Sequence, residues 1–313
     1  MDQSTFGRGL VQNTQSPRIE DVLSRPNPRL STTPPTSGMT RFNVPMLRWN
    51  NLSRWDDFNF QVLSDCFGDI LNKHISPINY VQPGPFEIKT LTDLKDMCTR
   101  SILPRLDQPM AIGAAELGSR LNQTFPRIYT GHDQLLAGGH RRSALSFMAD
   151  YDNSHRTHLV VSCVLHGSQW NSEALSNGVP AIAIEPIDRI ATYCLLANTR
   201  YGFILTTQEL VVVRVSGTAH KTNNSCQVEW QAIPWHASGP NVLTITLALW
   251  CLVMMSLRDT YRSICGPDQL LPLHRWWKYQ NLEGMAVYHH HISMREVFSQ
   301  PPGASVEERF LSG

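Results

Sequence analysis

One carboxylate, one thiol and two histidines in the middle of the chain are of types that could do chemistry. Asp150 follows an apolar run and could bind a metal ion, whereas Cys163 could be a nucleophile with His158 or His166 as its base. A buried strand cysteine without a neighbouring cation stays protonated, which favours an inert Cys163. A strand-end aspartate also commonly accepts hydrogen bonds from backbone amides, so a structural role for Asp150 is the alternative to metal binding.

Two further motifs lack the spacing that their chemistry needs. The run His289-His290-His291 looks like a metal site, but three adjacent side chains cannot all face one ion on a helix or strand. We therefore expect these histidines on a solvated face. The turn Gly138-Gly139-His140-Arg141-Arg142 lacks the G-x-x-x-x-G-K spacing of a phosphate loop. The pair Trp276-Trp277 is expected to cap an edge of the core.

Strands and helices alternate around these residues in a pattern typical of an α/β fold. Residues 145–151 and 157–165 predict two strands joined by a turn at 152–155, which places Asp150 and Cys163 on neighbouring strands. A helix with Thr92 as its N-cap is expected before them. The other expected elements are helices at 110–121 and 186–196 and strands at 201–205, 210–215 and 228–235.

The uncharged run from Val242 to Leu257 allows two interpretations, a buried helix or a membrane span. A span needs about 20 apolar residues. This run is shorter and contains Thr244, Thr246 and Ser256, so the sequence favours a core helix.

Several stretches between residues 90 and 258 together resemble a known superfamily. They are Ala149-Asp150-Tyr151, Val161-Ser162-Cys163-Val164-Leu165, Gln169-Trp170-Asn171, Arg189-Ile190-Ala191-Thr192-Tyr193, and Thr199 to Thr206 with Glu209-Leu210-Val211 beyond. With the order helix, strand, strand, helix, strand, they resemble the PD-(D/E)XK nuclease superfamily, and in particular a fungal branch of it. The resemblance implies a restriction-endonuclease-like fold with a central mixed sheet flanked by helices.

The resemblance also assigns a site, most of whose positions have changed. Members hold a divalent metal with an acid on one strand and a second acid on the next strand. A lysine follows two residues later, and a glutamine and a tyrosine lie on the following helix. Asp150 matches the first acid and is the one metal ligand retained, while Cys163 stands for the second acid and Leu165 for the lysine. Arg189 replaces the glutamine and Tyr193 is kept, and we expect a salt bridge from Arg189 to Asp150.

The resemblance therefore implies a catalytically degenerate, nuclease-like protein with a binding, scaffold or regulatory role and no cofactor. One alternative is an active nuclease that uses Mg²⁺, in which Glu116 or Asp96 has migrated into the site beside Asp150. Another is an accessory protein of a fungal secondary-metabolite pathway. The last alternative rests on the resemblance alone.

Composition bears on partners and compartment. Lys and Arg (27) nearly balance Asp and Glu (26), so the charge gives only weak support to a nucleic-acid partner. A protein partner or a small molecule is compatible with this charge, and the sequence does not name the partner. The seven cysteines include no CxxC pair, which favours buried free thiols in a reducing compartment. Met1–Leu10 lacks an apolar signal region, so we expect an intracellular protein, cytoplasmic or nuclear, with no membrane partner.

The chain is expected to divide into four parts. Residues 1–42, rich in Ser, Thr and Pro, predict a disordered tail, and 43–89 predict a helical N-terminal lobe. Residues 90–258 form the nuclease-like core, and 259–313 form a C-terminal extension.

Overall fold

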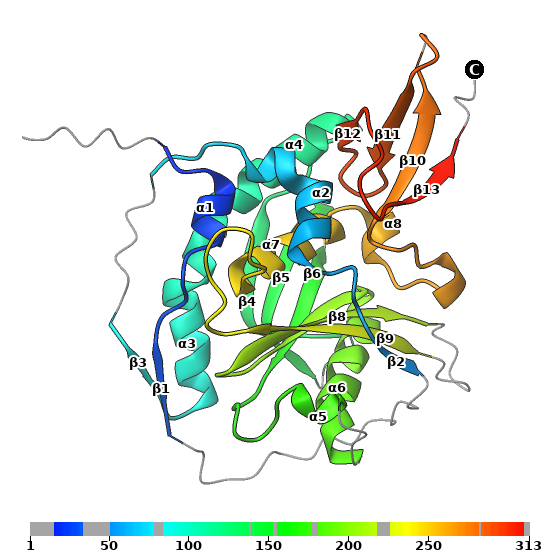
Figure 1. Ribbon diagram of the computed structural model, residues 1–313. Coiled ribbons are helices and arrows are strands. Elements are labelled where there is room, and N and C mark those ends of the chain that lie inside the picture. Colours follow the sequence, from blue (N-terminus) through cyan, green and yellow to red (C-terminus); the bar gives the residue numbers. More distant parts are fainter. Residues whose placement is uncertain are drawn as a thin grey trace, which may run out of the picture.

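The centre of the structure is a mixed sheet of seven strands in the order β2-β9-β8-β7-β6-β5-β4 (Figure 1). The computed structural model describes residues 16–33, 51–77, 84–137, 139, 141–152, 155–176, 181–217, 226–281 and 283–309. The β6–β7 and β2–β9 pairs are parallel and the other pairs are antiparallel, which confirms the predicted α/β (α+β) class. The strands are β2 (Leu52–Arg54), β4 (Ile128–Leu135), β5 (Arg142–Asp152), β6 (His155–Val164), β7 (Tyr201–Leu205), β8 (Glu209–Ser216) and β9 (Gln227–Pro234).

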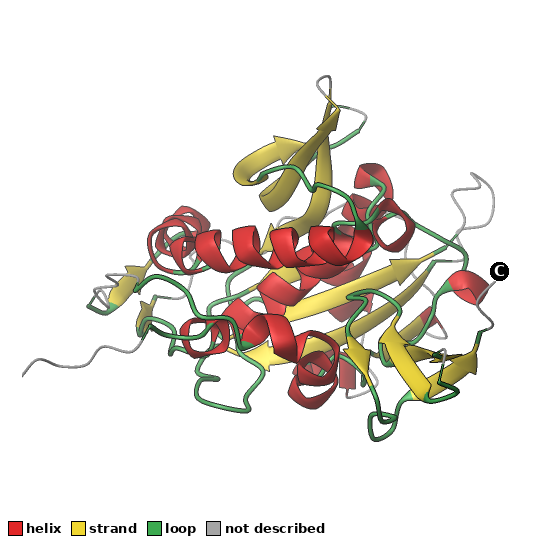
Figure 2. Cartoon of the chain, turned by 90° about the horizontal axis from the view of Figure 1, so that it is seen from above, coloured by secondary structure: helices red, strands yellow, loops and turns green. Residues whose placement is uncertain are grey.

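Helices cover both faces of this sheet (Figure 2). Strand alternation shows why: in β8, Leu210 and Val212 join one apolar cluster with the helix α7, and Val211 and Val213 join another with the helix α6. The helices are α1 (Ile19–Leu23), α2 (Phe60–Leu71), α3 (Leu91–Ser101), α4 (Asp107–Leu121), α5 (Glu173–Ser176), α6 (Ala181–Ala197), α7 (Ile245–Ser256) and α8 (Asp259–Arg262), with 3₁₀ turns at Leu103–Arg105 and Pro267–Gln269.

Local signals set the start of α3, although not at the residue expected. Thr90, and not Thr92, is the N-cap: its Oγ1 accepts a hydrogen bond from the Asp93 backbone N–H at 3.2 Å. The Asp93 carboxylate in turn accepts from the Thr90 N–H at 2.8 Å, which completes a capping box. Thr92 lies within the first turn of α3, where its backbone N–H has no acceptor inside the helix.

The uncharged run near the C-terminal third is the buried helix α7, as predicted. Every one of its residues is buried, and the Trp250 indole donates to the Pro109 carbonyl at 2.9 Å. Its N-cap Thr244 accepts from the Leu247 N–H and donates to the Leu23 carbonyl at 2.6 Å. None of the described helices is long and apolar enough to cross a membrane.

The expected tail is ordered where the structure describes it, so the prediction of disorder for residues 1–42 is wrong for 16–33. Ile19, Val22 and Leu23 on α1 are fully buried. The Trp235 indole donates to the Pro28 carbonyl at 2.8 Å, which fixes the chain after the helix. Three apolar side chains on one helical turn outweigh the polar composition around them. The remaining positions of the 1–42 segment lie outside the described residues.

Residues 43–89 do not form a separate helical lobe. β2 pairs with β9 in the central sheet, and α2 packs into the same core as α7, where Phe67 meets Trp250 edge to face at 5.6 Å. The same segment supplies β3 (Phe86–Ile88), which pairs in parallel with β1 (Leu30–Thr32). The apolar spacing of this segment therefore predicted the helix α2 correctly, whereas both strands were missed.

The C-terminal extension is a second sheet of four strands, ordered β12-β11-β10-β13. It corrects the expectation of solvated histidines, because His290 and His291 are buried. His290 bridges the Leu273 carbonyl and the Ser293 hydroxyl, each at 2.9 Å, and Ser293 donates to the Cys66 carbonyl of α2. Burial lowers the pKa of His290 to about 3. The strands are β10 (Arg275–Gln280), β11 (Ala286–His290), β12 (Glu296–Val297) and β13 (Ser305–Glu308).

Candidate functional site

Asp150 lies far from the other residues of the predicted site. It pairs with Arg156 near the turn between β5 and β6, and its carboxylate lies 3.7 Å from the Arg156 guanidinium. Cys163 lies seven positions further along β6, roughly 23 Å away at the usual rise of a strand. β5 also continues past Asp150 to Asp152. The structure therefore does not bring Asp150 together with Cys163 and Leu165.

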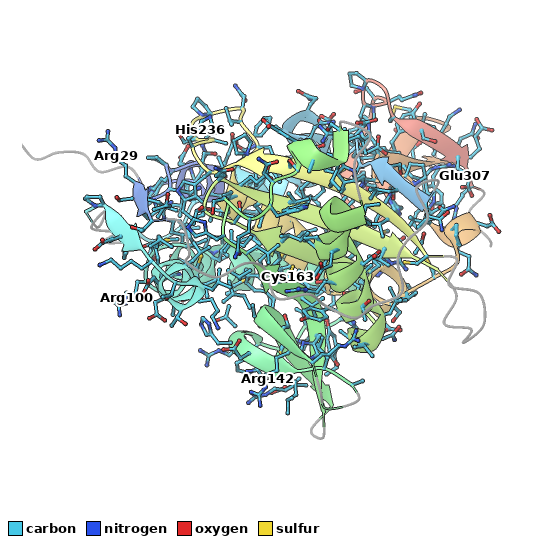
Figure 3. The ribbon with its side chains drawn as sticks, turned by 90° about the horizontal axis from the view of Figure 1, so that it is seen from below. Arg29, Arg100, Arg142, Cys163, His236 and Glu307 are labelled. Carbon is cyan, nitrogen blue, oxygen red and sulfur yellow. The ribbon has the colours of Figure 1, made fainter. Side chains whose placement is uncertain are left out.

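The other four predicted residues do come together, and we call them the Cys163 cluster: Cys163, Leu165, Arg189 and Tyr193. Cys163, Leu165 and Tyr193 are buried in the apolar cluster between the sheet and α6. Figure 3 shows Cys163 in this place. Arg189, one turn before Tyr193 on α6, pairs with Glu185 at 3.2 Å. This pairing corrects the expected salt bridge from Arg189 to Asp150. Asp150 lies where β5 ends and β6 begins, whereas Arg189 on α6 lies near Cys163 at the far end of β6.

The electrostatics of the Cys163 cluster favour a neutral thiol. Burial raises the pKa of Cys163 to about 12, and the nearby Arg189 guanidinium opposes this shift without cancelling it. Burial also raises the pKa of Tyr193, further raised by Cys163 and opposed by Arg189 and Arg141. Two guanidinium groups thus lie near the tyrosine, and no carboxylate is among the groups that shift the pKa of Cys163.

The register of the sheet places the start of β5, and not its end, beside Cys163. The paired residues of β5 and β6 run from Asp152 and His155 to Phe147 and Val160. Beyond that point the two strands are joined through the hydroxyls of Ser143 and Ser162. A carboxylate facing Cys163 from β5 would have to stand near Ser143, where this sequence has none.

The described residues form no metal-binding group around the Cys163 cluster. Within the described ranges, no three His, Cys, Asp or Glu side chains are placed to hold a metal ion. The two acids named as migrated ligands are also elsewhere: Glu116 on α4 pairs with Lys73 at 2.9 Å, and Asp96 is exposed on α3. Asp150 has Arg156 as its charged partner.

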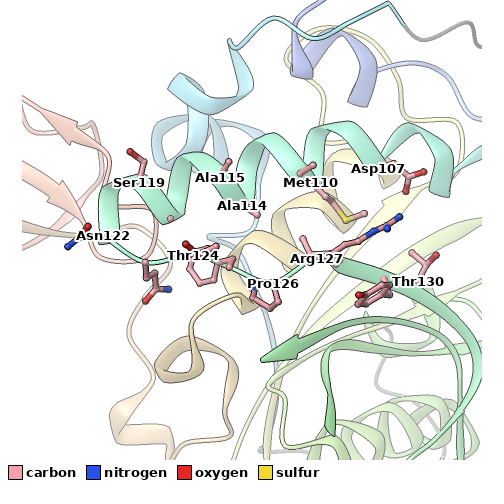
Figure 4. Close-up of a pocket in the computed structure, with 16 residues that line it drawn as sticks. Asp107, Met110, Ala114, Ala115, Ser119, Asn122, Thr124, Pro126, Arg127 and Thr130 are labelled. Carbon is pink, nitrogen blue, oxygen red and sulfur yellow. The ribbon is translucent and has the colours of Figure 1, made fainter. Parts of the chain in front are cut away.

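A groove of about 1080 Å³ lies between α4 and the chain that returns from it to β4 (Figure 4). One wall consists of small α4 residues and the other of residues 122–130. Arg127 and Asp107 lie at one end, and burial raises the pKa of Asp107 while Arg127 opposes the shift. The sequence reasoning missed this groove because β4 was not predicted. Apolar and polar residues hardly alternate in β4, whose residues are half-buried or exposed along its length. The one sequence signal for a strand there is the pair Ile128-Tyr129.

Comparison with known proteins identifies no family for this chain. The chain matches no family model, and no curated protein is significantly similar to it. The fold and the two sites therefore carry the functional argument.

Proposed function

We propose that this chain is a catalytically degenerate, nuclease-like protein that acts by binding, as a scaffold or regulator. The observation that carries the proposal is the Cys163 cluster. At the position where the resemblance expects a second acid and a lysine, β6 presents a buried neutral thiol and an aliphatic side chain.

The order of the elements supports the resemblance on which this proposal rests. α4 precedes the antiparallel strands β4, β5 and β6, and α6 then leads to β7, which is parallel to β6. This is the order helix, strand, strand, helix, strand expected from the sequence, with β4 added. Arg189 and Tyr193 on α6 face the β6 positions, as the glutamine and tyrosine of the superfamily pattern do.

The chemistry of the cluster argues against hydrolysis of a phosphodiester by the usual route. Magnesium needs several oxygen ligands, and neither a protonated thiol nor a leucine supplies one. The cationic Arg189 also disfavours a divalent cation beside Cys163. Without a metal ion, the fold lacks the group that polarises the phosphate and lowers the pKa of bound water.

A plasmid-nicking gel tests the proposal. We expect the full chain, with Mg²⁺ or Mn²⁺, to cleave supercoiled plasmid no faster than the Asp150→Ala variant, while a restriction enzyme on the same plasmid serves as positive control. Cleavage by the wild type that Asp150→Ala abolishes would overturn the proposal in favour of an active nuclease with migrated residues. Glu116→Ala and Asp96→Ala variants would then identify the second ligand, since loss of cleavage in one of them would place that acid in the site.

A further inference from the structure

The edge of the central sheet is covered along only part of β4. β4 is the terminal strand, so one of its edges has no partner among the strands that the structure describes. Over its second half α3 lies alongside: Lys95 pairs with Asp133 at 2.8 Å, and the Thr99 hydroxyl lies 2.9 Å from a ring nitrogen of His132. Over its first half, residues 128–130 face the groove. An unpaired strand edge offers backbone N–H and C=O groups to an added strand.

The opposite wall of the groove leaves room for such a strand. Small residues make up much of the α4 wall, namely Ala111, Ala114, Ala115 and Gly118, beside Asp107, Met110 and Ser119. α4 and β4 do not pack closely against each other, and an added strand would lie about 4.8 Å from β4. In Figure 4 the helix and the returning chain run side by side along the groove. A strand edge facing a helix in this way is the geometry in which extended peptides bind by strand addition.

The charges at the groove favour an acidic ligand. Arg127 is exposed, and among the described residues it makes no ion pair or hydrogen bond. Its guanidinium lies 5.7 Å from the Tyr129 ring, and the largely exposed Arg156 lies at the same distance from that ring. Among the described residues, Asp107 is the one carboxylate lining the groove, and burial raises its pKa while Arg127 opposes the shift. Arg127 therefore offers its charge to a ligand.

We propose that the α4–β4 groove binds an extended, acidic peptide segment that adds as a strand to the open edge of β4 and places a carboxylate on Arg127. This inference names the ligand class of the binding role proposed above, and it rests on that role. Strand addition supplies affinity through the backbone, and Arg127 supplies selectivity for charge.

Fluorescence anisotropy with the full chain tests the inference. The probe is a fluorescein-labelled octapeptide in which valine and glutamate alternate. We expect saturable binding, binding at least about tenfold weaker when lysine replaces glutamate, and an equal loss for Arg127→Gln with the acidic peptide. Arg100→Gln, an exposed charge on α3 outside the groove, is the matched control and leaves binding unchanged. Ala115→Trp fills the groove from an exposed helix position and abolishes binding.

Two measurements test the mode of binding. Because only alternate residues of an added strand bond to β4, N-methylation of every second peptide residue should block binding in one register and spare it in the other. Hydrogen exchange should slow in residues 126–131 when the acidic peptide is bound, and the Arg127→Gln variant should show less of this protection.

Three results would overturn the inference. They are equal binding of the acidic and lysine peptides, no effect of Arg127→Gln, or equal binding of both N-methylated registers. Displacement of the acidic peptide by a single-stranded oligonucleotide that binds more tightly would reassign the groove to nucleic acid. Failure of the peptide to bind leaves the nicking result standing, so the two proposals fail separately.

Discussion

Ser143 and Ser162 join β5 to β6 at the point where the pairing of the two strands ends. The Ser162 backbone N–H donates to the Ser143 hydroxyl at 2.8 Å, and the Leu145 N–H donates to the Ser162 hydroxyl at the same distance. Both hydroxyls also donate to the Leu145 carbonyl at 2.8 Å. The two side chains thus satisfy buried backbone groups that would otherwise pair in the ladder. They hold the start of β5 beside Cys163.

Replacing Ser162 should therefore cost more than a single hydrogen bond. Ser162→Ala leaves the buried Leu145 N–H without its acceptor, and an unsatisfied buried group costs about 1–3 kcal/mol. We expect the free energy of unfolding in urea to fall by about 2 kcal/mol with an unchanged m-value. Ser53→Ala, at an exposed position of β2, should change it by less than about 0.5 kcal/mol. Equal effects of the two substitutions would show that the Ser162 hydroxyl does not support the junction.

The central strands and the helix α7 were predictable because they are continuous apolar runs. The strand expected at 201–205 is β7 to the residue, and the strand expected at 210–215 is the centre of β8, since both are rich in apolar residues and buried on two faces. α7 was predictable for a similar reason, because an uncharged run of its length suits the core. By contrast, β4 is largely polar and lies at an edge, so no hydrophobic period marks it.

The site was only half predictable, because the resemblance assigned Asp150 and Cys163 to one site without regard to the register of their strands. Placing Asp150 and Cys163 on neighbouring strands was correct. The turn expected at 152–155 already separates them, because it puts Asp150 at one end of the hairpin and Cys163 at the other, as the pairing of Asp152 with His155 shows. The resemblance placed Cys163, Arg189 and Tyr193 in one site, and the structure has these three residues close together, although Arg189 pairs with Glu185 and not with Asp150.

The thiols should differ sharply in reactivity. All seven cysteines lie in the described part of the chain and are free, and six are buried while Cys265 is half-buried. Because the thiolate is the reactive form, the pKa of about 12 for Cys163 keeps it inert near neutral pH. We expect Ellman's reagent at pH 8 to titrate one thiol rapidly in the native protein and seven in guanidinium. Cys265→Ser should remove the fast phase, whereas a fast phase lost in Cys163→Ser would show an accessible, activated Cys163.

The contact between α4 and α7 should tolerate no added methyl group at Gly113. A Cβ there would lie 2.6 Å from the Met254 sulfur and 2.9 Å from the Trp250 ring. The Met254 side chain is flexible, but the Trp250 indole is held by its hydrogen bond to the Pro109 carbonyl. Gly113→Ala should therefore lower the free energy of unfolding by about 1–3 kcal/mol, although alanine favours helix by about 1 kcal/mol. Ser119→Ala, exposed on the same helix, is the control and should not lower it.

Stability should fall in mild acid because of the buried histidines of the C-terminal sheet. Burial lowers the pKa of His290 from 6.5 to about 3, and the neighbouring His274 and Arg295 lower it further against the opposing hydrogen bond to Leu273. Burial likewise lowers the pKa of His291. Between pH 6.5 and 3 the unfolded chain therefore binds more protons than the folded chain, so the free energy of unfolding falls as the pH falls. At pH 5 His290 alone should cost about 2 kcal/mol relative to pH 7.5.

Urea unfolding at pH 7.5 and pH 5.0 measures this loss, and variants assign it. His290→Gln should be less stable at pH 7.5, because it disturbs the contacts with Ser293 and Leu273, yet it should lose less stability on acidification than the wild type. His236→Gln removes an exposed histidine and should leave the pH dependence unchanged. The carboxylates titrate in the same direction at lower pH and are common to all three proteins, so the difference between the proteins isolates His290. An equal loss in the wild type and His290→Gln would mean that His290 is protonated in the folded chain, and the buried, neutral imidazole between α2 and the C-terminal sheet would have to be abandoned.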